Sequence, residues 1–128
     1  MLIADDHEAI RKGVRTILRS RANVEICGEA SDGSEAVRMA VELKPDLIIL
    51  DLTMPVMGGF AAAKELRLLL PEIPFLFYSM HDGTQLIKEA KQAGARGFVS
   101  KSRISDTLLD ALDAVIVRNG TFFPDGGT

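Results

Sequence analysis

The sequence alternates short apolar runs with longer stretches of helical period, and this alternation strongly constrains the fold. Five runs have the length and apolar content of buried strands: residues 1–4, 24–27, 47–50, 75–78 and 97–99. Five stretches carry the apolar spacing of amphipathic helices: residues 8–20, 34–43, 60–70, 83–93 and 104–118. Strands that alternate with helices predict one parallel sheet with helices on both faces, joined by right-handed crossovers.

Turn and capping residues agree with these boundaries. Asp32, with Glu35 three positions later, predicts a capping box at the start of the second helix. Pro45 ends that helix, because the residue before a proline is pushed out of the helical conformation. Gly94 has the position of a C-terminal glycine cap. At 128 residues, the chain has the length of one domain.

The composition excludes several classes of protein. With 47% hydrophobic and 26% charged residues, the chain is expected to fold rather than to stay disordered. The single cysteine, Cys27, excludes a disulfide framework and a cysteine-based zinc site, and its apolar neighbours predict a buried thiol. No apolar run reaches the ~20 residues of a membrane span, and the acidic start is not that of a signal peptide. We therefore expect a cytoplasmic protein with no membrane partner.

The charge distribution argues against direct binding to nucleic acid. The formal net charge is −3, and the 15 Lys and Arg residues are dispersed along the sequence. A protein that binds DNA needs a basic face, because contacts to phosphates and the release of counterions drive the binding. A role in transcription would therefore have to pass through another domain or protein.

Polar side chains follow four of the five predicted strands, at the edge of a parallel sheet where functional sites lie. Asp5 and Asp6 follow the first strand, Asp51 the third and Ser79 the fourth, and Lys101 comes shortly after the fifth. Carboxylates in close proximity repel, and at least one pKa rises unless a cation joins them. An acidic pocket of oxygen ligands suits Mg²⁺, which takes one or two carboxylates together with waters and phosphate oxygens.

Each of these residues, taken alone, has a simpler interpretation. Asp5 and Asp6 are well placed to cap the helix that follows them. Lys101 would be a surface lysine, and Ser79 would cap a turn at the end of a strand. Asp51 is harder to explain in this way, since a carboxylate directly after a fully apolar strand is partly buried and needs a partner. The combination of residues, rather than any one of them, predicts a site.

At these positions the chain resembles the receiver domain of bacterial two-component response regulators, and most of all the NarL/FixJ subgroup. The resemblance spans all five strand–helix units and is carried by Asp5, Asp6, residues 51–59, Ser79 and residues 97–101. It implies a CheY-like, flavodoxin-like doubly wound sheet with strand order 2-1-3-4-5 and five helices. Residues 1–119 would form the receiver domain. Residues 120–128 would be a C-terminal tail or the start of a linker to a helix-turn-helix output domain.

The resemblance also implies roles for the aspartates. Asp51 would be the phosphoacceptor, which attacks the phosphoryl group of a phosphohistidine on a partner kinase. Asp5, Asp6, Asp51 and the backbone carbonyl of Thr53 would hold Mg²⁺, with Mn²⁺ as a second candidate. The chemistry would be limited to phosphoryl transfer to the protein's own aspartate and slow hydrolysis, so whether to class the domain as an enzyme stays open.

Further residues would carry the switch. Lys101 would pair with Asp51 at rest and with a phosphoryl oxygen afterwards, and Ser79 would donate its hydroxyl to another phosphoryl oxygen. Phe98, three residues before the lysine, would turn inward as the hydroxyl moves. The implied partners are a sensor histidine kinase or a phosphotransfer protein of a phosphorelay, and a second copy of the chain on phosphorylation. DNA would be reached only through an output domain.

Several positions depart from the common pattern of the family. Met80 should narrow access to the phosphoryl group, and Gly58 replaces a frequent acidic residue and should loosen its loop. Ser102 replaces a frequent proline, which leaves the isomer of the preceding peptide bond open. Phe98 lacks the hydroxyl of the more common tyrosine. Only four residues precede the first aspartate, which suggests that a few N-terminal residues are missing or that the start is misplaced.

Two other functions stay open. A flavodoxin-like nucleotide-binding module shares this architecture, but its phosphate loop after the first strand would be rich in Gly, Ser or Thr, whereas this chain is acidic there. A degenerate receiver would act as an interaction module without taking phosphate. Intact Asp51, Ser79 and Lys101 argue against that alternative, whereas Met80 and the short first strand leave it open.

Overall fold

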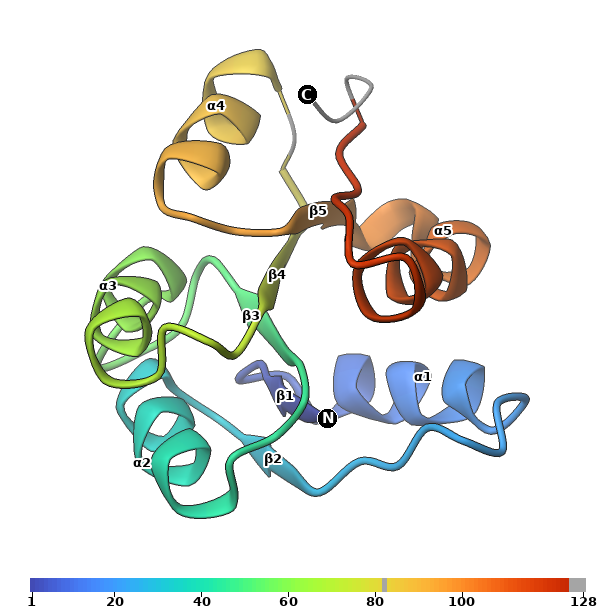
Figure 1. Cartoon of the computed structure of the whole chain (residues 1–128), viewed down its shortest axis with the longest axis horizontal. Helices are drawn as coiled ribbons and strands as arrows, with labels where there is room; N and C mark the ends of the chain where they lie inside the picture. The colour runs from blue at the N-terminus through green and yellow to red at the C-terminus, as the bar shows by residue number, and fades with distance from the viewer. Residues whose placement is uncertain (82, 125–128) are drawn as a thin grey trace.

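The computed structural model describes residues 1–81 and 83–124, whose five strands form one parallel sheet in the order β2-β1-β3-β4-β5 (Figure 1). The predicted fold class and strand order are confirmed. The strands are β1 (Leu2–Ala4), β2 (Gly28–Ala30), β3 (Ile48–Asp51), β4 (Phe75–Ser79) and β5 (Gly97–Ser100). The helices are α1 (Glu8–Leu18), α2 (Gly33–Leu43), α3 (Gly59–Leu69), α4 (Thr84–Gln92) and α5 (Ile104–Leu112). A 3-10 turn, η1 (Lys101–Arg103), precedes α5, and a π-helical turn, η2 (Asp113–Val117), continues it.

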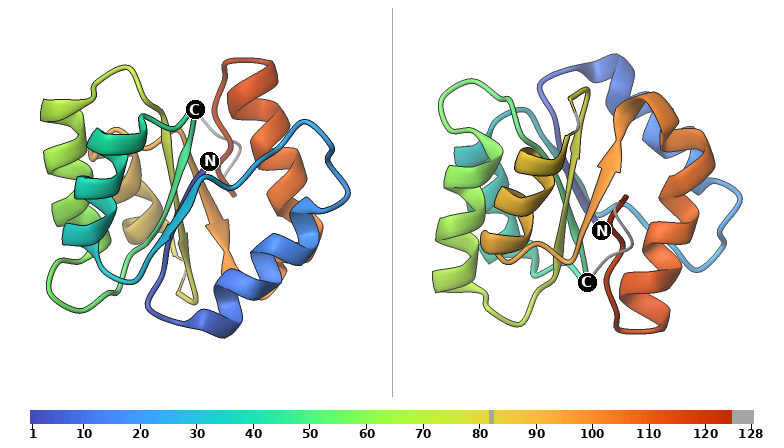
Figure 2. Two further views of the ribbon diagram at one scale, coloured as in Figure 1. Left: turned by 90° about the horizontal axis from the view of Figure 1, so that it is seen from below. Right: turned by 90° about the horizontal axis from the view of Figure 1, so that it is seen from above.

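The helices cover the two faces of the sheet unequally: α1 and α5 lie on one face, and α2, α3 and α4 lie on the other (Figure 2). The core divides in the same way, because successive side chains of a strand point to opposite faces. On β4, Phe75 and Phe77 pack toward α2, α3 and α4, whereas Leu76 and Tyr78 pack toward α1 and α5. Every residue of β3 and β4 is buried, which explains why these strands read as continuous apolar runs.

The second strand lies four residues later than predicted. Residues 24–27 are irregular, and β2 begins at Gly28. The reason is the register of the pairing with β1, which places Leu2 opposite Gly28, while Met1 bonds with the Glu25 carbonyl and the Cys27 amide outside this ladder. Without a partner strand the apolar run does not form a ladder. Cys27 is exposed, so the prediction of a buried thiol is wrong.

The predicted helix ends are mostly confirmed. The Asp32 carboxylate accepts a hydrogen bond from the Glu35 amide at 2.8 Å, although Glu35 bonds to the Ser31 amide rather than completing the box at Asp32. Lys44, just before Pro45, leaves the helical region with a φ of 47°. Gly94 closes α4 with a φ of 92°, which glycine adopts without strain. Among the described residues no helix is long and apolar enough to cross a membrane.

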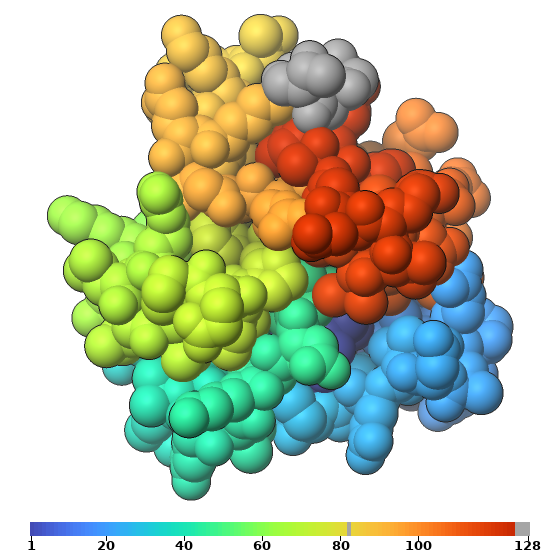
Figure 3. All heavy atoms as spheres, in the orientation of Figure 1, coloured from blue at the N-terminus to red at the C-terminus, as the bar shows by residue number. Residues whose placement is uncertain are grey.

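The described part of the expected tail packs against the edge of β5. Phe122 bridges to Gly97, its carbonyl accepts from the Phe98 amide at 2.8 Å, and its amide donates to the Arg96 carbonyl at 2.9 Å. Phe123 is buried, with the Lys91 ammonium 5.1 Å from its ring centre. The segment after α5 therefore lies between α4 and α5 (Figure 3). The rest of the expected tail, residues 125–128, falls outside the described residues.

Candidate functional site

The polar residues predicted from the strand ends meet at the carboxyl edge of the sheet. Asp5 follows β1, Asp51 ends β3, Ser79 ends β4 and Lys101 follows β5. Asp5, Asp51 and Ser79 are at most 4% exposed, which makes them the buried polar or charged residues of the described chain. Parallel strands bring these positions together, because all their carboxyl ends lie at one edge.

Lys101 is the cation that joins the buried carboxylates. Its Nζ lies 2.8 Å from Asp5 Oδ2 and 3.1 Å from Asp51 Oδ2, and its side chain is only 4% exposed. The predicted pairing with Asp51 is therefore present in this structure, and the pairing with Asp5 comes in addition. Two buried carboxylates with one ammonium leave a net negative charge that the described side chains do not neutralise here.

The pKa values of the two buried aspartates are shifted in opposite directions. Burial raises the pKa of Asp51, the Lys101 ammonium opposes this rise, and the nearby Asp5 carboxylate adds to it. Burial also acts to raise the pKa of Asp5, but the Lys101 ammonium, the hydrogen bond from the His7 amide and the nearby Tyr78 hydroxyl outweigh it and hold that pKa below the ordinary value. The pKa of Asp51 is therefore raised, with burial as the main cause and the crowding of aspartates expected from the sequence as a smaller one.

The loop after β1 does not use its aspartates as simple helix caps. The cap residue of α1 is His7, whose side chain makes no capping bond. Asp5 Oδ1 accepts from the His7 amide at 2.9 Å, and the His7 Nδ1 lies 3.2 Å from one carboxylate oxygen of Asp5 and one of Asp6. Asp6 is 31% exposed and remains open to solvent beside the buried pair. The alternative that both aspartates serve only as caps is wrong.

The acidic side chains have the composition of a site for a hard cation. Asp5, Asp6, His7 and Asp51 each offer one ligand atom, and these atoms lie within 4.8 Å of one another. Asp5 Oδ2 is buried and accepts no well-directed hydrogen bond from the described residues, although the Lys101 ammonium is 2.8 Å away. Three carboxylates, one of them with unused acceptor capacity, fit Mg²⁺. The Thr53 amide donates to Asp51 Oδ1 at 3.3 Å, which places this loop against the cluster.

The predicted switch residues lie on neighbouring strands. Ser79 Oγ accepts from the His81 amide at 3.0 Å, so its hydroxyl proton is free to donate elsewhere. Phe98 on β5 is fully buried and packs toward α4, so its ring already points inward in this structure. Met80 is 64% exposed. The described chain has no cis peptide bond, so the bond between Lys101 and Ser102 is trans.

The loop after Asp51 packs tightly against the end of β3. A methyl group at Gly59 would collide with the Asp51 carbonyl oxygen and come within 2.9 Å of the Leu52 Cα. The Gly59 amide in turn donates to the Leu52 carbonyl at 3.0 Å. Gly58, expected to loosen the loop, is the cap residue of α3 and has a φ of −76°, which other residues also adopt. The close approach at Gly59 holds α3 directly behind the acidic cluster.

Two residues of the site were missed by the sequence reasoning. Arg11 on α1 is only 13% exposed; its Nη1 donates to the Asp5 carbonyl, and its Nε donates to Glu29 on β2 at 3.0 Å. Its spacing of four from His7 was a usable signal, since such residues share a helix face. Tyr78 lies beneath the Lys101 ammonium, 4.8 Å from the ring centre. Its sequence context indicates only an apolar strand.

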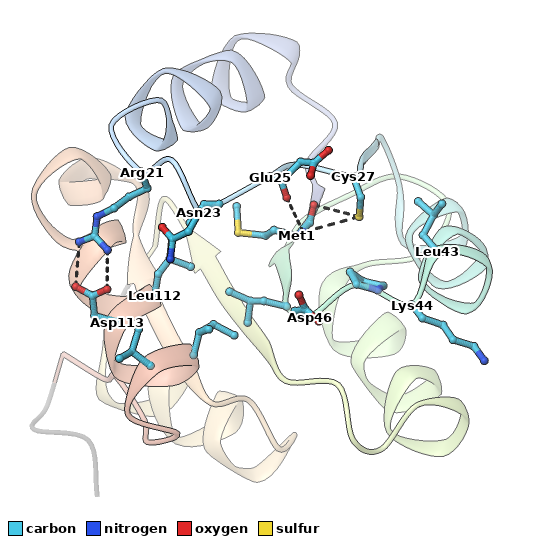
Figure 4. Close-up of a pocket in the computed structure, with 15 residues that line it drawn as sticks. Met1, Arg21, Asn23, Glu25, Cys27, Leu43, Lys44, Asp46, Leu112 and Asp113 are labelled. Carbon is cyan, nitrogen blue, oxygen red and sulfur yellow. Dashed lines mark hydrogen bonds and ion pairs between the residues drawn. The ribbon is translucent and has the colours of Figure 1, made fainter.

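A cavity of about 430 Å³ lies at the opposite end of the sheet, beside Met1 and Leu47 (Figure 4). Arg21 and Asp113 form a bidentate ion pair at its rim, with N–O distances of 2.7 and 3.0 Å. The hydrogen bond from Arg21 lowers the pKa of Asp113. The described residues that line this cavity include none of the acidic site, so the two features are separate.

Comparison with known proteins identifies the family to which this fold and site belong. Residues 1–113 match the family described as the response regulator receiver domain. The transcriptional regulatory protein YdfI of Bacillus subtilis is 36% identical over 125 residues, which are 98% of this chain and 58% of YdfI. The transcriptional regulatory protein LiaR of the same species is 36% identical over 114 residues, 89% of this chain and 54% of LiaR. The chain thus spans little more than half the length of these relatives.

Solved structures agree with the sequence matches. A LuxR-family two-component response regulator from Aurantimonas sp. SI85-9A1 has a TM-score of 0.90 and 34% identity, over 97% of this chain and 89% of that one. The isolated receiver domain of RcsB from Salmonella enterica serovar Typhimurium has a TM-score of 0.89 over 97% of this chain and 91% of its own; at 24% identity it shows the shared fold. This chain belongs to the response regulator receiver domains, and the proteins it resembles include transcriptional regulatory proteins and a LuxR-family two-component response regulator.

Proposed function

We propose that Asp51 accepts a phosphoryl group from a phosphohistidine and that the domain works as a phosphorylation-controlled switch. The observation that carries the proposal is the environment of the Asp51 carboxylate. It ends an apolar strand, is 4% exposed, and lies 3.1 Å from the Lys101 ammonium. Carboxylate oxygens of Asp5 and Asp6 lie within 4.8 Å of it. A buried carboxylate in such a cluster costs folding free energy, but it is well placed to act as a nucleophile.

Lys101 prepares the acceptor for the reaction. Burial raises the pKa of Asp51, and the ammonium counteracts that rise, so it favours the ionised form that can attack phosphorus. The carboxylate attacks in line while the bond between phosphorus and the histidine nitrogen breaks. When bound, Mg²⁺ offsets the negative charge of the phosphoryl oxygens. Asp5, Asp6, Asp51 and the Thr53 carbonyl are the groups proposed to hold it, and Mn²⁺ is expected to substitute.

The phosphorylated state is proposed to be read through β4 and β5. The Lys101 ammonium would turn from the carboxylates to a phosphoryl oxygen, and the Ser79 hydroxyl would donate to another. Phe98 is the neighbour through which this movement would reach α4, and the Phe98 amide also bonds to Phe122 in the segment after α5. The difference in a partner's binding free energy between the two states cannot exceed the free energy that separates those states.

The biological setting follows from the relatives and stays part of the proposal. We infer a sensor histidine kinase or phosphotransfer protein as the phosphoryl donor, a cytoplasmic location, and a homodimer formed on phosphorylation. Control of transcription would run through an output domain of the kind that transcriptional regulatory relatives carry beyond the matched length. The alternative of a degenerate receiver loses support because Asp51 and Lys101 are paired and the acidic cluster is complete.

The test is phosphorylation by a small donor. Acetyl phosphate with Mg²⁺ should add one phosphoryl group, measured by intact mass, and Asp51→Asn should abolish the addition. Asp46→Asn is the matched control, because Asp46 is an exposed aspartate just before the same strand. Undiminished labelling of the Asp51→Asn variant, or no labelling of the natural chain under any of these conditions, would overturn the proposal.

A further inference from the structure

Tyr78 is a buried tyrosine at the acidic site with no role so far. It is the penultimate residue of β4, is 1% exposed, and lies opposite Asp51 in the register of β3 with β4. Its side chain packs on the face covered by α1 and α5, as does that of Ile49, two residues before Asp51. Because side chains of a strand alternate, the ring is directed to the same face as the phosphoacceptor.

The ring of Tyr78 contacts the cation of the site. The Lys101 ammonium lies 4.8 Å from the ring centre, within the range of a cation–π interaction. The same ammonium lies 2.8 Å from Asp5 and 3.1 Å from Asp51, and its side chain is 4% exposed. Attraction between a cation and an aromatic ring is stronger when both are removed from water, as they are here. The ring therefore helps to hold the ammonium between the two carboxylates.

The hydroxyl of Tyr78 is available for a further contact. Tyr78 Oη and Asp5 Oδ2 are the two buried side-chain atoms that make no well-directed hydrogen bond in the described chain. The two side chains are neighbours, since the Lys101 ammonium lies 4.8 Å from the Tyr78 ring centre and 2.8 Å from Asp5 Oδ2. A phenol is a hydrogen-bond donor at neutral pH, and rotation about one C–O bond would direct its proton to the carboxylate. A buried donor without a partner is unfavourable unless another state uses it, and the acceptor beside it is held by the Lys101 ammonium in this structure.

We propose that Tyr78 is a positioning residue for Lys101. Its ring holds the ammonium between Asp5 and Asp51 before phosphorylation, and its hydroxyl donates to Asp5 Oδ2 when the ammonium moves to the phosphoryl group. The hydroxyl thereby takes the place of the ammonium at Asp5 Oδ2, beside the Mg²⁺ that the same carboxylate is proposed to hold. The inference rests on the proposed function, because that function requires Lys101 to move.

Three variants of the intact chain separate the two parts of the proposal. Tyr78→Phe keeps the ring and removes the hydroxyl, whereas Tyr78→Leu removes both. Phe75→Leu is the matched control: Phe75 is a buried ring on the same strand, at its other end and on its other face. One readout is the NMR signal of the Lys101 side-chain ammonium without metal or phosphate. The other is the affinity for beryllofluoride, a phosphoryl analogue, with Mg²⁺.

We expect Tyr78→Phe to leave the Lys101 signal in place and to weaken beryllofluoride binding about fivefold, the effect of one hydrogen bond of ~1 kcal/mol. Tyr78→Leu should in addition shift the Lys101 signal and speed the exchange of its protons. Phe75→Leu should lower thermal stability without either effect.

The two parts can fail separately. Unchanged beryllofluoride affinity in Tyr78→Phe would overturn the role of the hydroxyl, and an unchanged Lys101 signal in Tyr78→Leu would overturn that of the ring. If the natural chain binds no beryllofluoride, then the proposed function and the hydroxyl role fail together. The Lys101 signal in Tyr78→Leu still decides the role of the ring in that case.

Discussion

Replacing Lys101 by methionine should be among the most destabilising single substitutions at the site, because it leaves two buried carboxylates without a cation. The ammonium lies 2.8 Å from Asp5 and 3.1 Å from Asp51. At an effective dielectric constant of about 20, each attraction is worth roughly 5–6 kcal/mol before the cost of removing the charges from water. Breaking a buried pair by removing one partner typically costs about 3–5 kcal/mol.

That loss should be visible as a lower melting temperature. With an unfolding entropy of about 2.1 cal/mol/K per residue, 128 residues give ~0.27 kcal/mol per degree. Lys101→Met should therefore melt roughly 10–20 °C below the natural chain at pH 7 in EDTA. Lys64→Met, on an exposed lysine of α3, is the control and should melt within about 2 °C of the natural chain.

The effect should depend on pH with a definite sign. In the natural chain Lys101 opposes the rise in the pKa of Asp51 and helps to lower that of Asp5. Without it, the folded pKa values of both carboxyl groups rise, and that of Asp51 lies further above the ordinary 3.8, so ionisation at neutral pH works against folding. A carboxyl group with a raised folded pKa costs stability above that pKa, and the cost fades as the pH falls through it toward 3.8. The gap between variant and natural chain should therefore narrow from pH 7 to about pH 4.

Thermal melts of the natural chain, Lys101→Met, and Lys101→Met combined with Asp51→Asn provide the assay. The double variant should recover several degrees, because one of the two uncompensated carboxylates is gone. Equal melting temperatures of Lys101→Met and the natural chain would refute the reasoning that Lys101 neutralises buried charge. A difference in melting temperature that stays constant down to pH 4 would refute it as well.

Three further predictions follow from particular contacts. Gly59→Ala should lower the free energy of unfolding by about 1–3 kcal/mol, because the added methyl group collides with the end of β3. Gly13→Ala should raise the free energy of unfolding by roughly 0.5–1 kcal/mol, because the added methyl group meets no described atom within 4 Å. The urea midpoints of the two variants test both expectations. Met80→Ala should shorten the lifetime of the phosphorylated state severalfold by opening a path for water, and an equal or longer lifetime would show that access at this position is not limiting. Arg11→Gln should weaken Mg²⁺ binding about tenfold in calorimetry, because Arg11 donates a hydrogen bond to the Asp5 carbonyl. Arg15→Gln is the control, since Arg15 also contacts Glu29 and Glu8. Equal losses of Mg²⁺ affinity in both variants would contradict a role specific to the loop that holds Asp5.

The architecture was predictable because its signals are local. The period of apolar residues distinguishes strand from helix, and Pro45, Gly94 and Asp32 mark boundaries through their own backbone and capping chemistry. The rule that parallel strands share one functional edge then places Asp5, Asp51, Ser79 and Lys101 together before any coordinates are known. These inferences need no information on which side chains touch.

The errors arose where a neighbour distant in sequence decides the outcome. Residues 24–27 have the composition of a strand, but the register of the sheet pairs β1 with residues 28–30 instead. Cys27 is exposed for the same reason. The final helix is apolar enough to run on to residue 118, yet from Asp113 it changes to a π-helical turn, and Asp113 itself pairs with Arg21, 92 residues away.

By itself the sequence determined the strand–helix order, most helix ends and the identity of the residues at the carboxyl edge, because each depends on local periodicity and turn chemistry. Only the tertiary structure decided how those residues share charge. Lys101 joins Asp5 as well as Asp51, Tyr78 lies beneath its ammonium, and Arg11 reaches back to the loop after β1. Such couplings depend on burial and on distances of a few ångströms between separate strands and helices, and no local pattern in the chain encodes them.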